Sequence, residues 1–431
     1  MTRPGPSPPA SLPGDVLAAL DARLRHADEE LARRYPGDPG GRQPVHTVYV
    51  PADRFTADCA RQHGEEARRC LREHGPDPGA FAAAVGLPAA LAPQVYPLVV
   101  DKLHREPVED VRIDFEDGYG APGDAEEDRC AQTAAERAGR ALARGELPPF
   151  VGVRVKPLEH AARPRGIRTL DVFVTGLLAA TDGRLPPGFS VTLPKVTSPA
   201  QVTVFVELLE RLEGALGLPA GALRFEIQVE TTQAVLDHRG TVMLPRLVEA
   251  ARGRCTGVHF GTYDYTAACG LAPAQQHLAH PACDFARHVM QVATAGTGVR
   301  LSDGSTNVLP VPPDVHGGWR LHYNLVRRGL EHGFYQGWDL HPAQLPTRYA
   351  AVYAFYRQDL DWVGARLRAL APGGRTVGAV MDEPATARAL AGHVLRAVDC
   401  GAVDADEAES RTGLGAEDLR RLARRSPPMT P

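Results

Sequence analysis

The chain has 431 residues, of which 43% are hydrophobic and 23% are charged, as is usual for a folded globular protein. Its formal net charge of −4 excludes a global electrostatic attraction to nucleic acid or to an anionic membrane surface. Seven cysteines without a CxxC pair predict reduced thiols and a cytoplasmic protein. The first residues have no apolar signal-peptide core, and prolines interrupt the most apolar stretch, so we expect no membrane partner.

Short β-branched runs alternate with helical stretches along most of the chain. A helix is expected over Asp15–Arg34, before the breaker Tyr35-Pro36-Gly37. Eight strands are expected at 46–50, 111–115, 150–155, 189–193, 224–229, 257–260, 298–301 and 334–340. Helical periodicity between strands, as at 125–142, 199–216, 244–252 and 320–332, predicts parallel β–α units. The fold class is therefore α/β, most economically a (β/α)8 TIM barrel.

Three parts of the chain follow from this pattern. Residues 1–43 form a leader and an N-terminal helix, residues 44–372 the TIM barrel catalytic domain, and residues 373–431 a C-terminal helical appendage and candidate lid. Helices are expected in the appendage at 384–397 and 416–425. An open doubly wound sheet is the alternative, but no GxGxxG follows the first strand.

Charged and polar residues gather where the expected strands end. In a TIM barrel the carboxyl ends of the strands form one rim, which holds the active site. The residues at this rim are Asp114, Glu116, Asp117, Arg154, Lys156, Lys195, Glu230, Asp264, His341 and Gln344.

The excess of acids at one rim requires a countercharge, which a divalent metal ion supplies. Carboxylates without cysteine or clustered histidine favour Mg²⁺ or Mn²⁺ over zinc. A hard metal ion beside arginine and lysine suits a 2-oxo acid, because the metal takes the keto oxygen and one carboxylate oxygen, and the cations take the rest. Lysine occurs only at Lys102, Lys156 and Lys195, so a lysine at the rim suggests a need for a compact ammonium.

Six motifs at the strand ends, in this order, resemble the citrate lyase β-subunit and 2-oxo-acid aldolase superfamily, which shares a pyruvate- and phosphoenolpyruvate-type barrel with malate synthases. They are DFEDG (114–118), VRVKP (153–157), LPKV (193–196), QVET (228–231), FGTYDYT (260–266) and LHPAQ (340–344). GTYDY looks most like malate synthase. The stretch AVMDEP (379–384) looks like the citramalyl-CoA and malyl-CoA lyase branch.

The resemblance implies a role for individual residues. Glu230 and Asp264 match two metal-binding carboxylates. Arg154 matches an arginine that contacts the oxo acid and the developing enolate. Asp382 matches the acid that serves as base, on a C-terminal segment that covers a barrel mouth, often a neighbour's. Asp114 and Glu116, with Asp117 beside them, match acids that hold metal-bound waters.

Other residues complete the candidate site. Lys195 joins Arg154 and Asp382 as a catalytic candidate. The candidates for substrate binding are Arg154, Lys156, Arg54, His341 and Gln344. The sequence departs from the family pattern at Lys156, where asparagine is common, and after Arg54, because VPADR (50–54) lacks the proline that follows in the family.

These observations favour an Mg²⁺-dependent carbon–carbon lyase or aldolase. Its substrate would be a 2-oxo acid such as pyruvate or glyoxylate, or an adduct that yields one, either a CoA thioester or a free acid, and its enolate would be stabilised by the metal. We expect a homo-oligomer. One alternative is phosphotransfer on the same barrel, with Lys195 neutralising a phosphoryl group. Another is a barrel that binds or regulates without catalysis.

Overall fold

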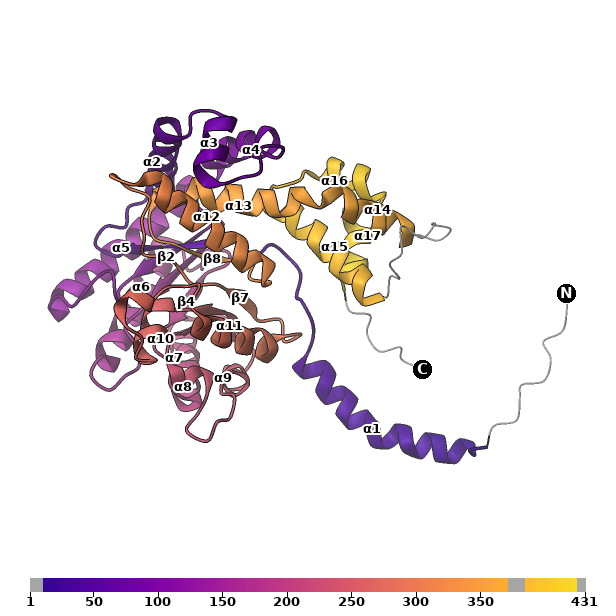
Figure 1. The fold of residues 1–431 in the computed structure, drawn as a ribbon. Helices are drawn as coiled ribbons and strands as arrows, with labels where there is room; N and C mark the ends of the chain where they lie inside the picture. Colours follow the sequence, from indigo (N-terminus) through magenta and orange to yellow (C-terminus); the bar gives the residue numbers. More distant parts are fainter. Residues whose placement is uncertain (1–10, 371–383, 425–431) are drawn as a thin grey trace.

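A nearly closed ring of eight parallel strands forms the centre of the molecule, in a computed structural model that describes residues 11–370 and 384–424 (Figure 1). The pairing order is β7-β6-β5-β4-β3-β2-β1-β8, in which β1 pairs with β8, and it excludes the doubly wound alternative. Between β7 and β8, Asp303 N donates to the Gln336 carbonyl at 2.8 Å. All eight expected strands are confirmed: β1 (His46–Pro51), β2 (Asp110–Asp114), β3 (Phe150–Arg154), β4 (Ser190–Leu193), β5 (Arg224–Val229), β6 (Cys255–Phe260), β7 (Arg300–Ser302) and β8 (Gly337–Asp339).

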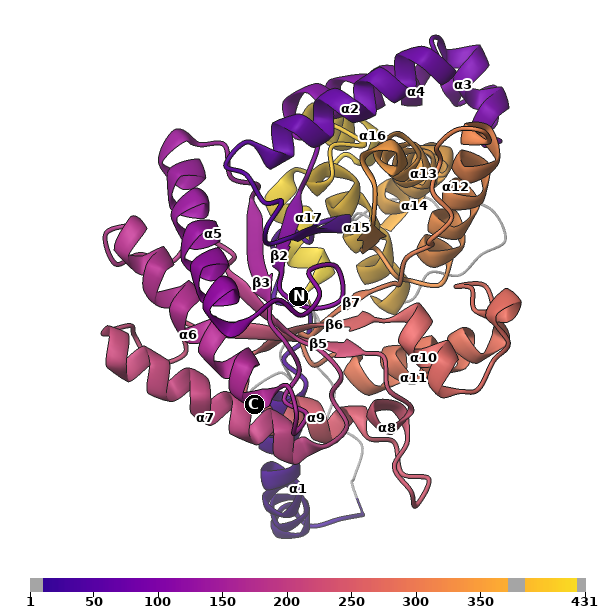
Figure 2. The ribbon, with the colours of Figure 1, turned by 90° about the vertical axis from the view of Figure 1, so that its left-hand side faces the viewer.

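Helices surround the ring and return the chain to the start of each next strand (Figure 2). Three follow β1, in the long insert before β2: α2 (Cys59–His74), α3 (Pro78–Val85) and α4 (Ala92–Arg105). The others, in chain order, are α5 (Asp124–Arg144), α6 (Arg163–Ala180), α7 (Pro199–Leu216), α8 (Thr232–Val235), α9 (Leu244–Ala250), α10 (Thr262–Ala268), α11 (Pro281–Thr294), α12 (Val315–Glu331) and α13 (Leu345–Gln358).

Local sequence sets where these helices begin and end. In α3, the side chain of Asp77 accepts from Ala80 N at 2.9 Å, and Pro78 occupies the first turn, where no donor is needed. Gly86 ends the same helix with a φ of 83°, a conformation that costs glycine little.

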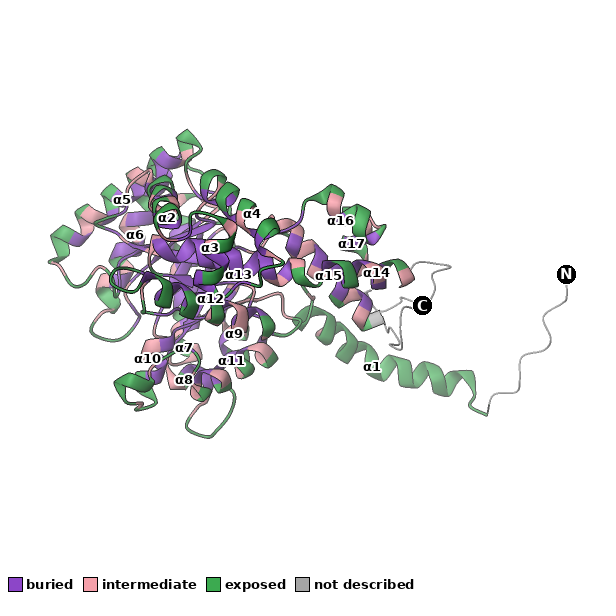
Figure 3. Ribbon diagram, turned by 45° about the horizontal axis from the view of Figure 1, so that its top comes forward, coloured by how far each residue is buried: buried purple, intermediate pink, exposed green. Residues whose placement is uncertain are grey.

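The core lies between the strands and the outer helices (Figure 3). The rings of Phe205 on α7 and Phe225 on β5 pack 5.1 Å apart, edge to face. Helices α5 and α6 pack closely because their interface is made of small residues. A Cβ at Gly139 would lie 2.5 Å from the Cβ of Ala180, so even alanine would force these helices apart.

Two helical parts extend from the barrel. Helix α1 (Gly14–Arg34) precedes it, and α14 (Leu360–Leu370), α15 (Pro384–Asp399), α16 (Ala405–Thr412) and α17 (Ala416–Ala423) form the C-terminal appendage. Arg396 on α15 lies 3.3 Å from Asp38 and 4.5 Å from the ring centre of Tyr335. Because Asp38 and Tyr335 precede β1 and β8, the described part of the appendage lies at the amino ends of the strands.

No helix within residues 11–370 and 384–424 is both long enough and apolar enough to cross a membrane.

Candidate active site

Arg154, the last residue of β3, lies at the centre of the carboxyl end of the barrel. The strand register places it beside Asp114, whose carboxylate accepts from Arg154 Nε at 2.6 Å and from Nη2 at 2.7 Å. Arg154 Nη1 lies 3.0 Å from Glu116 Oε2. Burial lowers the pKa of this guanidinium, but Asp114 and Glu116 outweigh burial and raise it. Arg154 is therefore a fixed, buried cation.

The loop after β2 wraps around the same acid. Glu116 N and Gly118 N donate to the carboxylate of Asp114 at 3.0 and 3.1 Å, so Asp114 holds both the arginine and the loop. Asp117 projects outward, with more than half of its side chain exposed, and its Oδ2 lies 3.7 Å from Arg154 Nη1. Burial would raise the pKa of Asp117, but Lys195 and Arg154 lower it.

The ammonium of Lys195 lies among four carboxylates. Its Nζ is 2.8 Å from Glu116 Oε1, 3.1 Å from Asp264 Oδ2, 3.5 Å from Asp117 Oδ1 and 3.9 Å from Glu230 Oε1. Burial opposes its charge, but Glu230 and Glu116 outweigh burial and raise the pKa of the amine. This side chain supplies part of the countercharge that the acids require.

The backbone at Lys195 is strained. Its φ of 50° is uncommon for a residue with a Cβ, and its N–H donates to Glu230 Oε1 at 2.7 Å. Both the backbone and the side chain of Lys195 therefore face Glu230.

Glu230, which follows β5, is the acid whose negative charge its surroundings stabilise least. Its carboxylate also accepts from Gln228 Nε2 at 3.0 Å. Burial raises the pKa of Glu230 to about 8, with Lys195 opposing and Glu116 and Asp264 adding to the effect. A strongly shifted acid among charged groups at a barrel mouth is typical of functional sites.

Glycine allows the next strand to approach Glu230. A Cβ at Gly261, in the GTYDY motif, would lie 2.4 Å from the Cβ of Glu230. The chain then enters α10, whose first turn carries Asp264, a half-exposed acid that faces Lys195. Glu230 and Asp264 thus both lie within 4 Å of the ammonium of Lys195.

Two residues at this site were not anticipated from the sequence. The ring centre of Tyr49, on β1, lies 4.6 Å from the Arg154 guanidinium, and its hydroxyl is buried without a hydrogen-bond partner in the described structure. Gln228 connects Glu230 to Arg154 Nη1, which lies 3.5 Å from its Oε1. Side chains alternate between the two faces of a strand, and this alternation places both residues inside the barrel. It is the signal in the sequence that could have identified them.

Lys156 and Arg54 lie apart from the acid cluster. Lys156 Nζ bonds to Glu127 Oε2 on α5 at 2.7 Å and to the Phe115 carbonyl at 2.9 Å. It points towards the helices rather than the mouth. Arg54 is exposed in the loop after β1, and its side chain has no hydrogen bond or ion pair with the described residues.

The remaining candidates follow β8 or lie outside the described structure. His341 Nδ1 accepts from Ala343 N at 3.1 Å, and the side chain of Gln344 accepts from Leu340 N at 2.7 Å. Both side chains therefore shape the start of η2 (Pro342–Gln344), and burial lowers the pKa of His341. Asp382 is outside the described residues.

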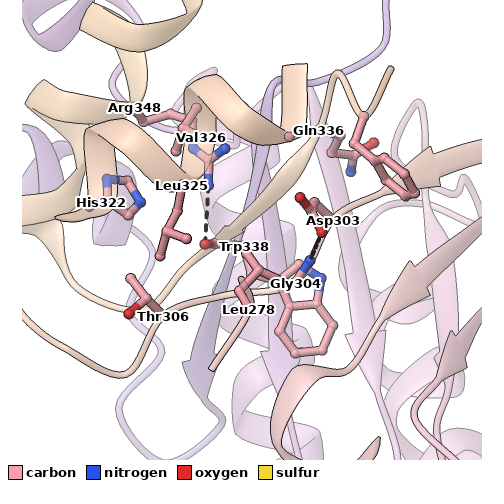
Figure 4. A pocket seen from close by; sticks show the side chains of 12 residues that line it. Leu278, Asp303, Gly304, Thr306, His322, Leu325, Val326, Gln336, Trp338 and Arg348 are labelled. Atoms are coloured by element: carbon pink, nitrogen blue, oxygen red, sulfur yellow. Dashed lines mark hydrogen bonds between the residues drawn. The ribbon is translucent and has the colours of Figure 1, made fainter. Parts of the chain in front are cut away.

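Two cavities lie away from this cluster. One, of about 10 Å³, lies between β7, β8 and α12, where Arg348 donates to the Trp338 carbonyl and Gly304 N to Asp303 (Figure 4). It has room for a single water molecule. The other, of about 330 Å³, opens at the amino ends of the strands beside Arg112 and Glu226. Neither is lined by Arg154, Lys195 or Glu230.

Comparison with solved structures supports the fold. A citrate lyase from Burkholderia xenovorans LB400 is 19% identical, with a TM-score of 0.56, over 86% of this chain and 97% of that chain. Malate synthase from Haloferax volcanii is 15% identical, with a TM-score of 0.50, over 90% of this chain and 99% of that chain. These likenesses confirm the TIM barrel fold that the sequence predicted.

A family match covers nearly the whole chain. Residues 24–426 match the family described as Domain of unknown function (DUF6986), and the chain belongs to that family.

Proposed function

We propose that this protein is a carbon–carbon lyase or aldolase that acts on a 2-oxo acid, or on an adduct that yields one. The observation that carries this proposal is a buried arginine and a lysine held by five carboxylates at the carboxyl end of the barrel. The fold is shared with a citrate lyase and a malate synthase, whose names denote breaking and making of such bonds. Fold alone does not determine activity, so the proposal depends on the charges at the site.

The described residues suit stabilisation of an enolate. In the cleavage direction the substrate hydroxyl loses a proton, the carbon–carbon bond breaks, and its electron pair leaves negative charge on an enolate oxygen. Arg154, fixed by Asp114 and supported by the ring of Tyr49, presents a cation whose position does not change during the reaction. Lys195 adds a second positive charge beside it. The base that the family resemblance implies is Asp382.

The donor set fits Mg²⁺, which takes oxygen ligands and needs only one or two protein carboxylates when water and substrate complete its shell. Glu230 and Asp264 would hold it. Burial raises the pKa of Glu230, and a bound cation would favour its charged form. As placed, no three His, Cys, Asp or Glu side chains of residues 11–370 and 384–424 form a metal site by themselves. When bound, Mg²⁺ would polarise the carbonyl of the oxo acid and stabilise the enolate.

A substrate panel tests the proposal. The full-length protein is incubated with Mg²⁺ and either CoA thioesters or free hydroxy-oxo acids, and release of pyruvate or glyoxylate is followed. Release that is abolished by a chelator supports the proposal. Phosphate transfer from phosphoenolpyruvate without any carbon–carbon cleavage would replace it with the phosphotransfer alternative.

Calorimetry tests the metal ligands separately. Glu230→Gln should keep the fold and lose Mg²⁺ affinity, because a neutral amide is a much weaker ligand for a hard cation. Glu213→Gln is the matched control, since Glu213 lies outside the barrel mouth and pairs with Arg254. Equal Mg²⁺ affinity in the Glu230→Gln variant and the unmodified protein would contradict the assignment. If neither protein binds Mg²⁺ or turns over a substrate, a non-catalytic barrel is the better explanation.

A further inference from the structure

Helix α1 has no core to pack against. It runs for 21 residues, none of them buried, and is exposed along its whole length (Figure 3). Its contact with the barrel is confined to its C-terminal end, where Arg34 lies 3.3 Å from Glu249 and Gly37 N donates to the Gly296 carbonyl at 2.8 Å. In proteins most of the stability of a helix comes from packing of its apolar face, and α1 leaves that face exposed.

The apolar residues of α1 follow a coiled-coil repeat. Leu17, Leu20, Leu24, Ala27 and Leu31 are spaced alternately three and four residues apart, which is the a and d spacing of a heptad. The four leucines are 47–61% exposed. A strict three–four alternation gives a narrow seam suited to another helix, whereas packing on a globular core favours a wider stripe.

The flanking charges indicate the identity and direction of the partner. In this heptad Arg23 occupies a g position and Asp28 the following e position. A parallel pair of identical helices brings the g residue of one copy against the next e residue of the other, so Arg23 meets Asp28 on both sides of the seam. Neither residue has an ion-pair partner in the described structure. An antiparallel pair would bring Asp21 of one copy against Asp28 of the other, which repel, and Arg23 against Glu30, which attract, so its flanking charges gain less than those of the parallel pair.

We propose that α1 is a dimerisation helix that pairs in parallel, and in register, with α1 of a second copy of this chain. The pair covers the four leucines and gives ion-pair partners to Arg23 and Asp28, which have none among the described residues. It places both barrels at the same end of the pair. Near that end α11 exposes Phe285 and Val292, the latter 82% exposed, a second apolar surface next to the point where α1 leaves the barrel. The proposal does not depend on the proposed activity.

Disulfide trapping tests the pairing in the full-length protein. Leu17→Cys is made in a Cys269→Ser background, because Cys269 is the one exposed cysteine among the described residues. Mild oxidation should join two copies, since residue 17 of one helix faces residue 17 of the other in a parallel pair. Ala22→Cys, on the outer face of α1, is the matched control and should cross-link at least about tenfold less.

Two further variants distinguish specific pairing of the α1 helices from cross-linking by random collision of two copies. Adding Leu24→Glu to the Leu17→Cys protein places two like charges in the seam and should lower the cross-link yield by about tenfold or more. Adding Ala22→Glu, with the same charge on the outer face, should leave the yield unchanged. Since α1 contributes nothing to the core, both variants should keep the barrel folded, as circular dichroism would verify.

Three outcomes would overturn the proposal. The first is equal cross-linking of the Leu17→Cys and Ala22→Cys proteins. The second is a yield that Leu24→Glu does not lower. The third appears on mixing the Leu20→Cys and Leu31→Cys proteins, because preferential trapping of the mixed dimer would show that the helices run antiparallel.

Discussion

Glu226 on β5 and Glu230, the residue that follows this strand, have opposite electrostatic environments, although their side chains lie on the same face of the chain. Glu226 is near the amino end of the barrel, and Glu230 is at the carboxyl end, four residues later. Arg112 donates to both oxygens of Glu226, at 2.9 and 2.7 Å, and His259 Nε2 lies 3.1 Å away. Burial would raise the pKa of Glu226, but Arg112 and His259 outweigh it and lower it. Burial instead raises the pKa of Glu230 to about 8.

The difference identifies which end of the barrel is built for stability. At the amino end two pairs of acids lie close to cations: Arg112 pairs with Asp110 and Glu226, and Arg42 and Lys102 both pair with Glu106 and Glu109. At the carboxyl end five carboxylates share Arg154 and Lys195. An uneven charge balance costs stability and persists where a substrate or metal ion restores it. The predictions below test this distinction.

The largest effect is expected on turnover in Arg154→Lys. A lysine cannot reproduce the paired bonds of the guanidinium to Asp114, so the cation loses its fixed position. We expect turnover of the substrate found in the panel to fall by about two to four orders of magnitude. Arg165→Lys, on α6, is the control and should keep its activity. Unchanged turnover in Arg154→Lys would show that the arginine only holds the loop.

At the amino end the corresponding change should act on stability. Arg112→Met leaves Asp110 and Glu226 buried without their cation, which should lower the free energy of unfolding by about 3–5 kcal/mol. Urea unfolding measures this loss. The double variant Arg112→Met with Glu226→Gln should recover part of it, because one buried charge is removed. A loss below about 1 kcal/mol would mean that solvent reaches this cluster.

Much of this arrangement could be anticipated from the sequence, and the exceptions have physical reasons. The β-branched runs located all eight strands, and the residues that follow them located Arg154, Lys195 and Glu230. Lys156 could not be placed in this way, because β3 ends at Arg154 and the alternation of sides ends with the strand. Its pairing with Glu127 depends on how α5 packs.

The environment of Lys195 was also beyond sequence reasoning. A positive φ is expected of glycine, so nothing in LPKV signals the turn that brings its N–H to Glu230. The position of Tyr49 beneath Arg154 depends on the distance between β1 and β3 across the barrel, which only the ring of strands fixes.

The third prediction concerns how the free energy of unfolding of the Glu230→Gln variant changes with pH in the presence of a chelator. In the native protein this acid keeps its proton until about pH 8, whereas in the unfolded chain it loses it near 4.5. The native state therefore binds more protons between these values, and the unmodified protein loses stability as the pH rises through them. Glu230→Gln does not titrate, so its stability relative to the unmodified protein should increase by about 3.5 kcal/mol from pH 5 to pH 8. A constant difference across this range would contradict the raised pKa.

The smallest effect on stability is expected for Glu106→Gln at the amino end, and its dependence on pH is opposite to that of Glu230→Gln. Glu106 accepts from Arg42 Nη1 at 3.0 Å and also pairs with Lys102. Burial would raise its pKa, but these two cations lower it to about 2, against 4.5 in the unfolded chain. The stabilisation is present above pH 4.5 and is lost as the pH falls towards 2, because the native carboxylate then takes up a proton. Since a quarter of the side chain is exposed, we expect Glu106→Gln to cost only about 1 kcal/mol at pH 7. Thermal unfolding of the two proteins should converge as the pH is lowered. If the difference between their unfolding temperatures instead grows as the pH falls, the cations at this end stabilise the protonated acid. The contrast between the two ends of the barrel then does not hold for Glu106.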